Sequence, residues 1–311
     1  MIEKICCICH KPVGPDAPRL GARCYCETHY AKLTQDRRSV WTSGVVQIVG
    51  LLAFVGVVVL IVSLAKVALD GVALVWAGVV LALIPALLWL GFFYQQDRLE
   101  PEPKGFVLGV FLLGGLLASA VGIPVVRDLF QVQEWMSHST AANLLGSVLV
   151  IGFVQEFLKY ATVRYSVYLS PEFDERIDGV VYGTAAGLGF ATMLNIHYVT
   201  ANAGVNLGVG VVRIAVTALA QASFAGISGY FLGRAKFEEE PVWWLPLGVT
   251  IAALLNGLFT YARGEIVTVG LNYRPVNGLI FATAVAVATF AALYYLMRRA
   301  NRLTLAAGSS G

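Results

Sequence analysis

The chain has 311 residues, of which 58% are hydrophobic and only 13% are charged. A soluble globular domain carries about 25% charged residues, so this composition excludes an ordinary soluble domain and indicates a multi-pass membrane protein. The formal net charge of +3 is small, and we expect no nucleic-acid partner.

The N-terminal segment has the pattern of a small metal-binding module. All five cysteines lie within the first 26 residues, and sixteen residues separate a C-x2-C pair from a C-x2-H pair. Two such pairs supply four ligands for a tetrahedral, structural zinc ion in a reducing compartment. The predicted ligands are Cys6, Cys9, Cys26 and His29. Cys7 and Cys24 are not assigned as ligands, and either could replace one of the four predicted ligands. We predict a zinc-ribbon-like module over residues 1–40.

Eight apolar stretches of span length follow this module. They cover residues 44–66, 71–94, 105–126, 141–164, 178–200, 206–232, 242–262 and 275–297. Each has about the 20 apolar residues that cross a bilayer as a helix, and lipid forces every backbone group to be satisfied within its own segment. We predict an all-α bundle of about eight transmembrane helices over residues 41–300, with 301–311 as a flexible tail or a cloning remnant.

Basic residues in the loops predict the orientation of the bundle. Seven lysines and arginines precede the first span, and Arg298, Arg299 and Arg302 follow the last one. The connections on the opposite side are poorer in lysine and arginine. Because such residues favour the cytoplasmic side, we expect both termini in the cytoplasm.

Polar side chains inside the spans are the candidates for function, since they are costly in lipid. Glu156 and Lys159 are i, i+3 neighbours and can pair, with Lys159 reaching toward the cytoplasmic surface. Arg213 also needs a buried partner, and a Glu156–Arg213 pair would lock the bundle. The amides of Asn195, Gln221 and Asn256 can join helices by hydrogen bonds.

The spans also carry a resemblance to a known family. The segments are "YQQDRLEPEPKG", "QEFLKY", "DGVVYGTAAGLGFATMLN", "RIAVTALAQASFAGISGYFLG" and "NGLFTY". In this order they resemble the PrsW-type intramembrane metalloproteases, which are related to the CAAX prenyl endoproteases. The resemblance covers the second to seventh spans and implies the same helical framework.

Two of the family's catalytic motifs are degenerate here. Active members resemble one another in an E-E-x-x-K motif, whereas this chain has Gln155 and Glu156 before Lys159. They also share F-x-x-x-E-N, where this chain has Leu194 in place of the acid, followed by Asn195. The resemblance therefore implies that two site carboxylates are missing.

Two further motifs have lost their histidines. Active members carry an arginine followed eight residues later by a histidine, and here Arg213 is followed by Gln221. They carry H-G-x-x-D, where this chain has Asn256 and Thr260. The reactive side chains of the family are therefore replaced, while the apolar framework is kept.

The donor count leads to the same expectation without the family. A hydrolytic zinc ion needs about three protein ligands and an open water position, together with a base for that water. The spans contain a single histidine, His197, and one deep carboxylate, Glu156. His197 follows Asn195 by two residues and so points about 200° away from it on a helix. We expect no metal in the membrane domain.

The sequence therefore predicts a catalytically inactive PrsW-like membrane protein, a pseudoprotease. It would act as a scaffold or binding subunit for a membrane protein or a lipid, with the zinc module as a second contact surface. One alternative is an active intramembrane metalloprotease with a rearranged site built from Glu156, His197 and Asp178. A second is a transporter of small molecules or lipids along the polar seam between spans four and seven.

Overall fold

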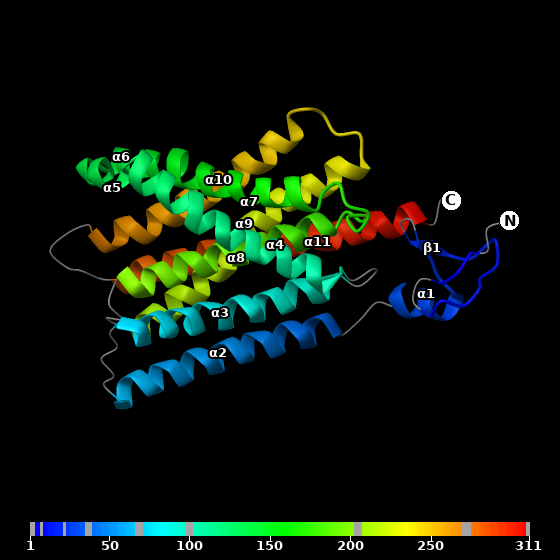
Figure 1. Cartoon of the computed structure of the whole chain (residues 1–311), viewed down its shortest axis with the longest axis horizontal. Coiled ribbons are helices and arrows are strands. Elements are labelled where there is room, and N and C mark those ends of the chain that lie inside the picture. Colours follow the sequence, from blue (N-terminus) through cyan, green and yellow to red (C-terminus); the bar gives the residue numbers. More distant parts are fainter. Residues whose placement is uncertain are drawn as a thin grey trace.

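The chain folds into a bundle of long helices with a small module at one end, seen in a computed structural model (Figure 1). The structure describes residues 4–6, 9–20, 23–34, 39–65, 71–97, 102–201, 207–268 and 275–308. Both termini lie at the same end of the bundle (Figure 1).

The N-terminal module contains the only β-structure among the described residues. Strand β1 (Arg19–Leu20) pairs antiparallel with β2 (Arg23–Cys24), and the short helix α1 (Glu27–Thr34) follows. Strand β1 contacts α11 (Pro275–Gly308), so the module packs against the end of the bundle where the C-terminus lies.

The bundle is built from helices whose apolar content fits them to lipid. The long ones are α2 (Ser39–Ala65), α3 (Gly71–Gln96), α4 (Lys104–Leu117), α7 (Phe153–Ser166), α8 (Asp178–Ala201), α9 (Leu207–Phe237), α10 (Trp244–Thr268) and α11. Two π-helical turns, η1 (Ala118–Gly122) and η2 (Val125–Leu129), extend α4. Short elements lead into α7: α5 (Val132–Trp135), η3 (Met136–His138), α6 (Thr140–Leu145) and η4 (Gly146–Gly152).

Six helical stretches are long and apolar enough to cross a membrane. They are Gly71–Gln96, Lys104–Leu129, Thr140–Ser166, Asp178–Ala201, Gly210–Phe237 and Trp244–Ala262. These confirm six of the eight predicted spans and an all-α membrane protein. The other two predicted spans fall on α2 and α11, so the total of eight stays a prediction.

The C-terminal prediction needs one correction. Residues 301–308 are helical, because α11 continues to Gly308 instead of ending before a flexible tail. The segment from Asn301 to Ala307 contains no proline or glycine, and five of its seven residues are leucine, alanine or arginine, which favour helix. Residues 309–311 lie outside the described part of the chain.

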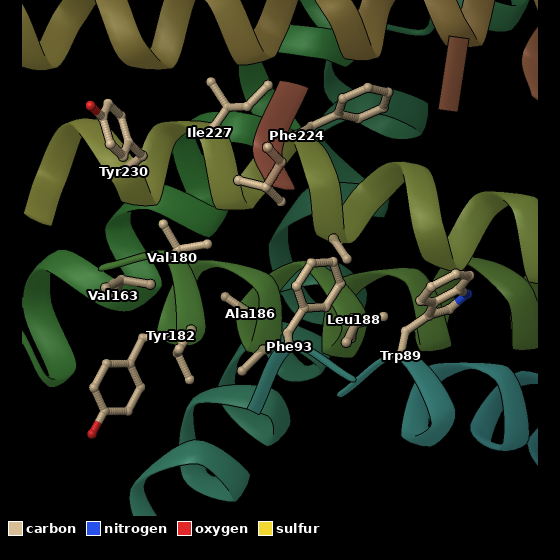
Figure 2. Packing of buried hydrophobic residues seen from close by; sticks show 14 of the residues in the cluster. Trp89, Phe93, Val163, Val180, Tyr182, Ala186, Leu188, Phe224, Ile227 and Tyr230 are labelled. Atoms are coloured by element: carbon tan, nitrogen blue, oxygen red, sulfur yellow. The ribbon is translucent and has the colours of Figure 1, made fainter. Parts of the chain in front are cut away.

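Helix α8 lies at the centre of the bundle and contacts α9, α4 and α3. Small residues let the backbones of these helices approach closely. At Gly189 of α8, a Cβ atom would lie 1.8 Å from the Phe111 carbonyl oxygen of α4, so only glycine fits there. Figure 2 shows the apolar contacts, with Phe93 of α3 against Ala186 and Leu188 of α8. Close backbone approach at small residues is typical of helix packing in membranes.

Candidate functional site

A buried polar network joins three helices in the middle of the bundle. Helix α7 supplies Gln155, Glu156 and Lys159, α9 supplies Gln221, and α10 supplies Asn256. The three α7 residues fall within about one helical turn, so they can face the same neighbours. All five side chains are buried. Each of the five was a candidate residue from the sequence, and the structure places them in one network.

The five side chains bond to one another. The Lys159 ammonium donates to Glu156 Oε1 and, at 2.5 Å, to Gln221 Oε1. Asn256 Nδ2 donates to Glu156 Oε1 at 2.7 Å and to Gln155 Oε1 at 3.0 Å. Gln221 Nε2 donates to Asn256 Oδ1 at 3.1 Å. The predicted i, i+3 pair and the predicted interhelical amide bonds are therefore present.

Two predictions about these charges are wrong. Lys159 does not reach the surface, since it is 1% exposed. Glu156 pairs with Lys159 and not with Arg213, whose guanidinium lies 3.7 Å from the ring centroid of Tyr198. Arg213 precedes Gln221 by eight residues, roughly 12 Å along α9. Gln221 shares the Lys159 ammonium with Glu156, so Arg213 lies too far along α9 to reach the Glu156 carboxylate.

The other candidate residues, Asn195, Leu194 and Thr260, add no carboxylate or imidazole to the network. Asn195 is buried, and its Nδ2 donates to the Ile214 carbonyl oxygen at 3.1 Å, which ties α8 to α9. Leu194 is partly buried. Thr260 Oγ1 lies 3.5 Å from Asn256 Oδ1.

The residues of the rearranged-site alternative are not assembled. His197 is exposed near the far end of α8, whereas Asp178 is its first residue. Nineteen residues separate them, which is roughly 28 Å along a helix. Glu156 is held in the Lys159 pair. These three side chains cannot bind one ion together.

The polar network does not fit a catalytic metal ion. Such an ion needs about three imidazole, thiolate or carboxylate ligands, and the network offers one carboxylate and three neutral amides. The Lys159 ammonium already lies between the oxygens of Glu156 and Gln221. Within the network, Glu156 Oε2 is the one acceptor atom without a hydrogen-bond partner, and a single oxygen cannot hold a metal.

A second group of donor atoms lies in the N-terminal module. One ligand atom each from Cys6, Cys9, Cys26 and His29 lies within 4.8 Å of the others. His29 Nδ1 is 3.1 Å from Cys26 Sγ and 3.6 Å from Cys6 Sγ. These four residues could hold a metal ion. Cys24 is not part of the group, and Cys7 falls outside the described residues.

A third polar group was not predicted from the sequence, although one of its members, Asp178, was a candidate for the rearranged site. Asp97, Glu175 and Asp178 each place a carboxylate oxygen within 4.8 Å of the others. Glu102 adjoins them, because its backbone N–H donates to Asp97 Oδ2 at 3.0 Å. The available signal was the "DRLEPEP" stretch, which contains two of the four acids.

Burial changes the acidity of this group outside the spans. It raises the pKa of the Glu102 carboxyl to about 7, although a hydrogen bond from Tyr182 acts in the opposite direction. Burial, followed by the charges of Glu175 and Glu102, raises the pKa of Asp97 well above its usual range. The four acids, Asp97, Glu102, Glu175 and Asp178, are called the acidic cluster below.

Comparison with known proteins identifies the class of this fold. Residues 102–293 match the family described as PrsW family intramembrane metalloprotease. The match covers more than half of the chain, so the chain belongs to the PrsW family, and the predicted resemblance is confirmed.

Curated relatives support the same assignment. Protease PrsW of Halalkalibacterium halodurans is 35% identical over 179 residues, which is 57% of this chain and 79% of the relative. Protease PrsW of Bacillus subtilis is 33% identical over 183 residues, covering 57% and 78%. Protease PrsW of Geobacillus kaustophilus is 36% identical over 178 residues, covering 57% and 75%. No solved structure matches the chain.

Proposed function

We propose that this chain is a catalytically inactive member of the PrsW family, which serves as a scaffold or binding subunit for a membrane protein or a lipid. One observation carries the proposal. Besides Glu156 and Lys159, which the motif of active members also contains, the buried network offers only the neutral amides of Gln155, Gln221 and Asn256. A metal-dependent hydrolase would need acidic and imidazole ligands there.

Charge balance explains why this arrangement resists a metal. Glu156 and Lys159 neutralise each other in a region without solvent access. A divalent ion would have to displace the ammonium, which would leave a second cation buried and unpaired at a cost of about 3–5 kcal/mol. The neighbouring amides satisfy one another, so the network is stable without a metal.

The replacements fall on the ligand positions of the family. By the resemblance, Gln155 and Leu194 stand where active members have acids, and Gln221 and Asn256 stand where they have histidines. All four are neutral side chains, and three of them bond within the network. The family match over residues 102–293 suggests that the helices lining a substrate groove in active members have counterparts here. Retention of the framework with loss of the ligands is the pattern expected of a binding protein.

The N-terminal module would provide the second contact surface. Cys6, Cys9, Cys26 and His29 would bind one structural zinc ion, since they supply a closed set of four soft ligands. A module of about 40 residues cannot bury enough apolar surface alone, so the metal would hold it folded. The positive loops at the end of the bundle that carries both termini favour a cytoplasmic location for this module.

Zinc analysis of the full-length protein in neutral detergent tests whether the membrane domain lacks a zinc ion. We expect about one zinc ion per chain, and none in the Cys6→Ser/Cys9→Ser variant, by inductively coupled plasma mass spectrometry. A Glu156→Gln variant should keep the zinc content of the wild type. Stoichiometric zinc in the double cysteine variant would revive the metalloprotease hypothesis.

Chemical cross-linking in native membranes tests the binding role. A scaffold should give one defined cross-linked partner, or one enriched lipid, whose recovery survives Glu156→Gln. A protease would instead accumulate cleaved fragments of its partner in the wild type, and these would disappear in the variant. Fragments that depend on Glu156 would refute the inactive assignment.

A further inference from the structure

The acidic cluster lies where three helices meet at one end of the bundle. Asp97 follows α3, Glu102 precedes α4, Glu175 precedes α8, and Asp178 is the first residue of α8. The four side chains are between 0% and 3% exposed. Each stands at or just outside the end of a candidate span. The cluster is therefore a buried site at the membrane boundary.

Hydrogen bonds satisfy only part of this cluster. The Glu102 and Glu175 N–H groups donate to Asp97 Oδ2 and Asp178 Oδ2, at 3.0 Å and 2.5 Å. The Tyr182 hydroxyl donates to Glu102 Oε2 at 2.6 Å. Within the described chain, Asp97 Oδ1, Glu102 Oε1 and Asp178 Oδ1 accept from no N–H or hydroxyl donor. The Glu102 and Asp178 carboxyls can bond to each other only by sharing a proton. Buried charged oxygens without partners are strongly unfavourable unless a cation compensates them.

Among the described residues, the basic side chain beside the cluster, Lys236, has no hydrogen bond to the four carboxylates. The charge of Lys236 acts on Asp178 and Glu102, but its ammonium donates to three backbone carbonyls. It bonds to the Tyr168 and Phe173 oxygens at 2.6 Å, and to the Ser170 oxygen at 3.4 Å. An ammonium has three N–H donors, so these carbonyls use all of them.

We propose that Asp97, Glu175 and Asp178 bind a hard divalent cation of the Mg²⁺ or Ca²⁺ class, with Glu102 beside them as a further carboxylate. The donors are all oxygens, which such ions prefer, and no thiolate or imidazole takes part. Two oxygens on opposite sides of a Ca²⁺ ion are about 4.8 Å apart. The three donor atoms lie within 4.8 Å of one another, so they can share one ion.

The ion would fasten one end of the central helix. Asp97 follows α3, and Glu175 and Asp178 hold the start of α8, which contacts α3, α4 and α9. A shared cation would fix these segments where their helices leave the bilayer. This site differs from the prediction of a metal-free membrane domain. That prediction considered only the ligands of a hydrolytic zinc ion. It is separate from the proposed inactivity, since it shares no residue with the Glu156 network.

Manganese binding measured by electron paramagnetic resonance tests the site in the full-length protein in neutral detergent. We expect about one saturable Mn²⁺ ion per chain, displaced by CaCl₂ or MgCl₂. Asp97→Asn keeps an oxygen for the Glu102 N–H and removes the charge, and it should weaken binding at least about ten-fold. Glu134→Gln, at an exposed acid of another segment, is the matched control and should bind as the wild type does.

A second measurement covers the case in which Asp97→Asn does not fold. The thermal midpoint of the wild-type protein should rise with CaCl₂ or MgCl₂ above its value in NaCl of equal ionic strength. Equal midpoints in the two salts would overturn the proposal. So would the absence of saturable Mn²⁺ binding, or unchanged binding in a folded Asp97→Asn protein. Shared protons would then hold the cluster together.

Discussion

Replacing Glu156 by alanine tests the buried pair directly. The change removes the carboxylate that accepts from Lys159 and from Asn256. Gln221 Oε1, at 2.5 Å, would be the remaining partner of the ammonium within the network. Lys159 cannot escape to water, since it is 1% exposed. The variant therefore leaves a buried positive charge with one neutral acceptor.

The size of the effect follows from that uncompensated charge. Removing one member of a buried ion pair costs about 3–5 kcal/mol of unfolding free energy. At about 2–4 °C of midpoint per kcal/mol, the thermal midpoint should fall by roughly 6–20 °C. Asn256 keeps Gln155 Oε1 as an acceptor at 3.0 Å, so most of the loss should come from Lys159.

Thermal unfolding in neutral detergent, followed by tryptophan fluorescence, measures this loss. The double variant Glu156→Ala/Lys159→Met should recover most of the midpoint, because a pair replaced by apolar groups is often neutral. Glu134→Ala, at an exposed acid, should change stability by less than about 0.5 kcal/mol. A Glu156→Ala protein that melts like the wild type would refute the structural role of the pair, as would a double variant with no recovery.

Three further changes and one control test separate parts of the fold. Gly189→Ala places a Cβ 1.8 Å from the Phe111 oxygen and should cost about 1–3 kcal/mol. Gly109→Ala, with nothing within 4 Å, should cost nothing measurable by the same melting assay. Cys9→Ser should abolish stoichiometric zinc in metal analysis, because three ligands remain. Lys236→Met leaves three carbonyls without their donor and should lower the thermal midpoint, at about 1–3 kcal/mol for each buried acceptor.

Much of the fold could be predicted because the signals are local. The hydropathy of each span is a property of consecutive residues, and six predicted spans coincide with helices of sufficient length. The C-x2-C and C-x2-H spacings likewise predicted a group of Cys6, Cys9, Cys26 and His29, and the structure has these four residues together. The Glu156–Lys159 pair was predictable because i, i+3 residues are neighbours on any helix.

Contacts between helices were harder to predict. Glu156 had two candidate cations, and only the relative position of α7 and α9 decides between Lys159 and Arg213. The acidic cluster combines residues from the α3–α4 connection with others at the start of α8, about 80 positions further on. Acids in loops normally face water, so composition gave no reason to expect Asp97 and Glu175 to be buried.

One physical criterion separates the two polar sites of the bundle. In the central network, a single acid meets a single base and neutral amides bond to one another, so the charges balance although Glu156 Oε2 has no partner. If the chain is inactive as proposed, this pairing of charges would let the helices stay together without an ion. In the acidic cluster, three residues each keep a buried carboxylate oxygen without an N–H or hydroxyl donor. The same requirement, that buried charge be compensated, argues against a metal beside Lys159 and for a cation beside Asp97.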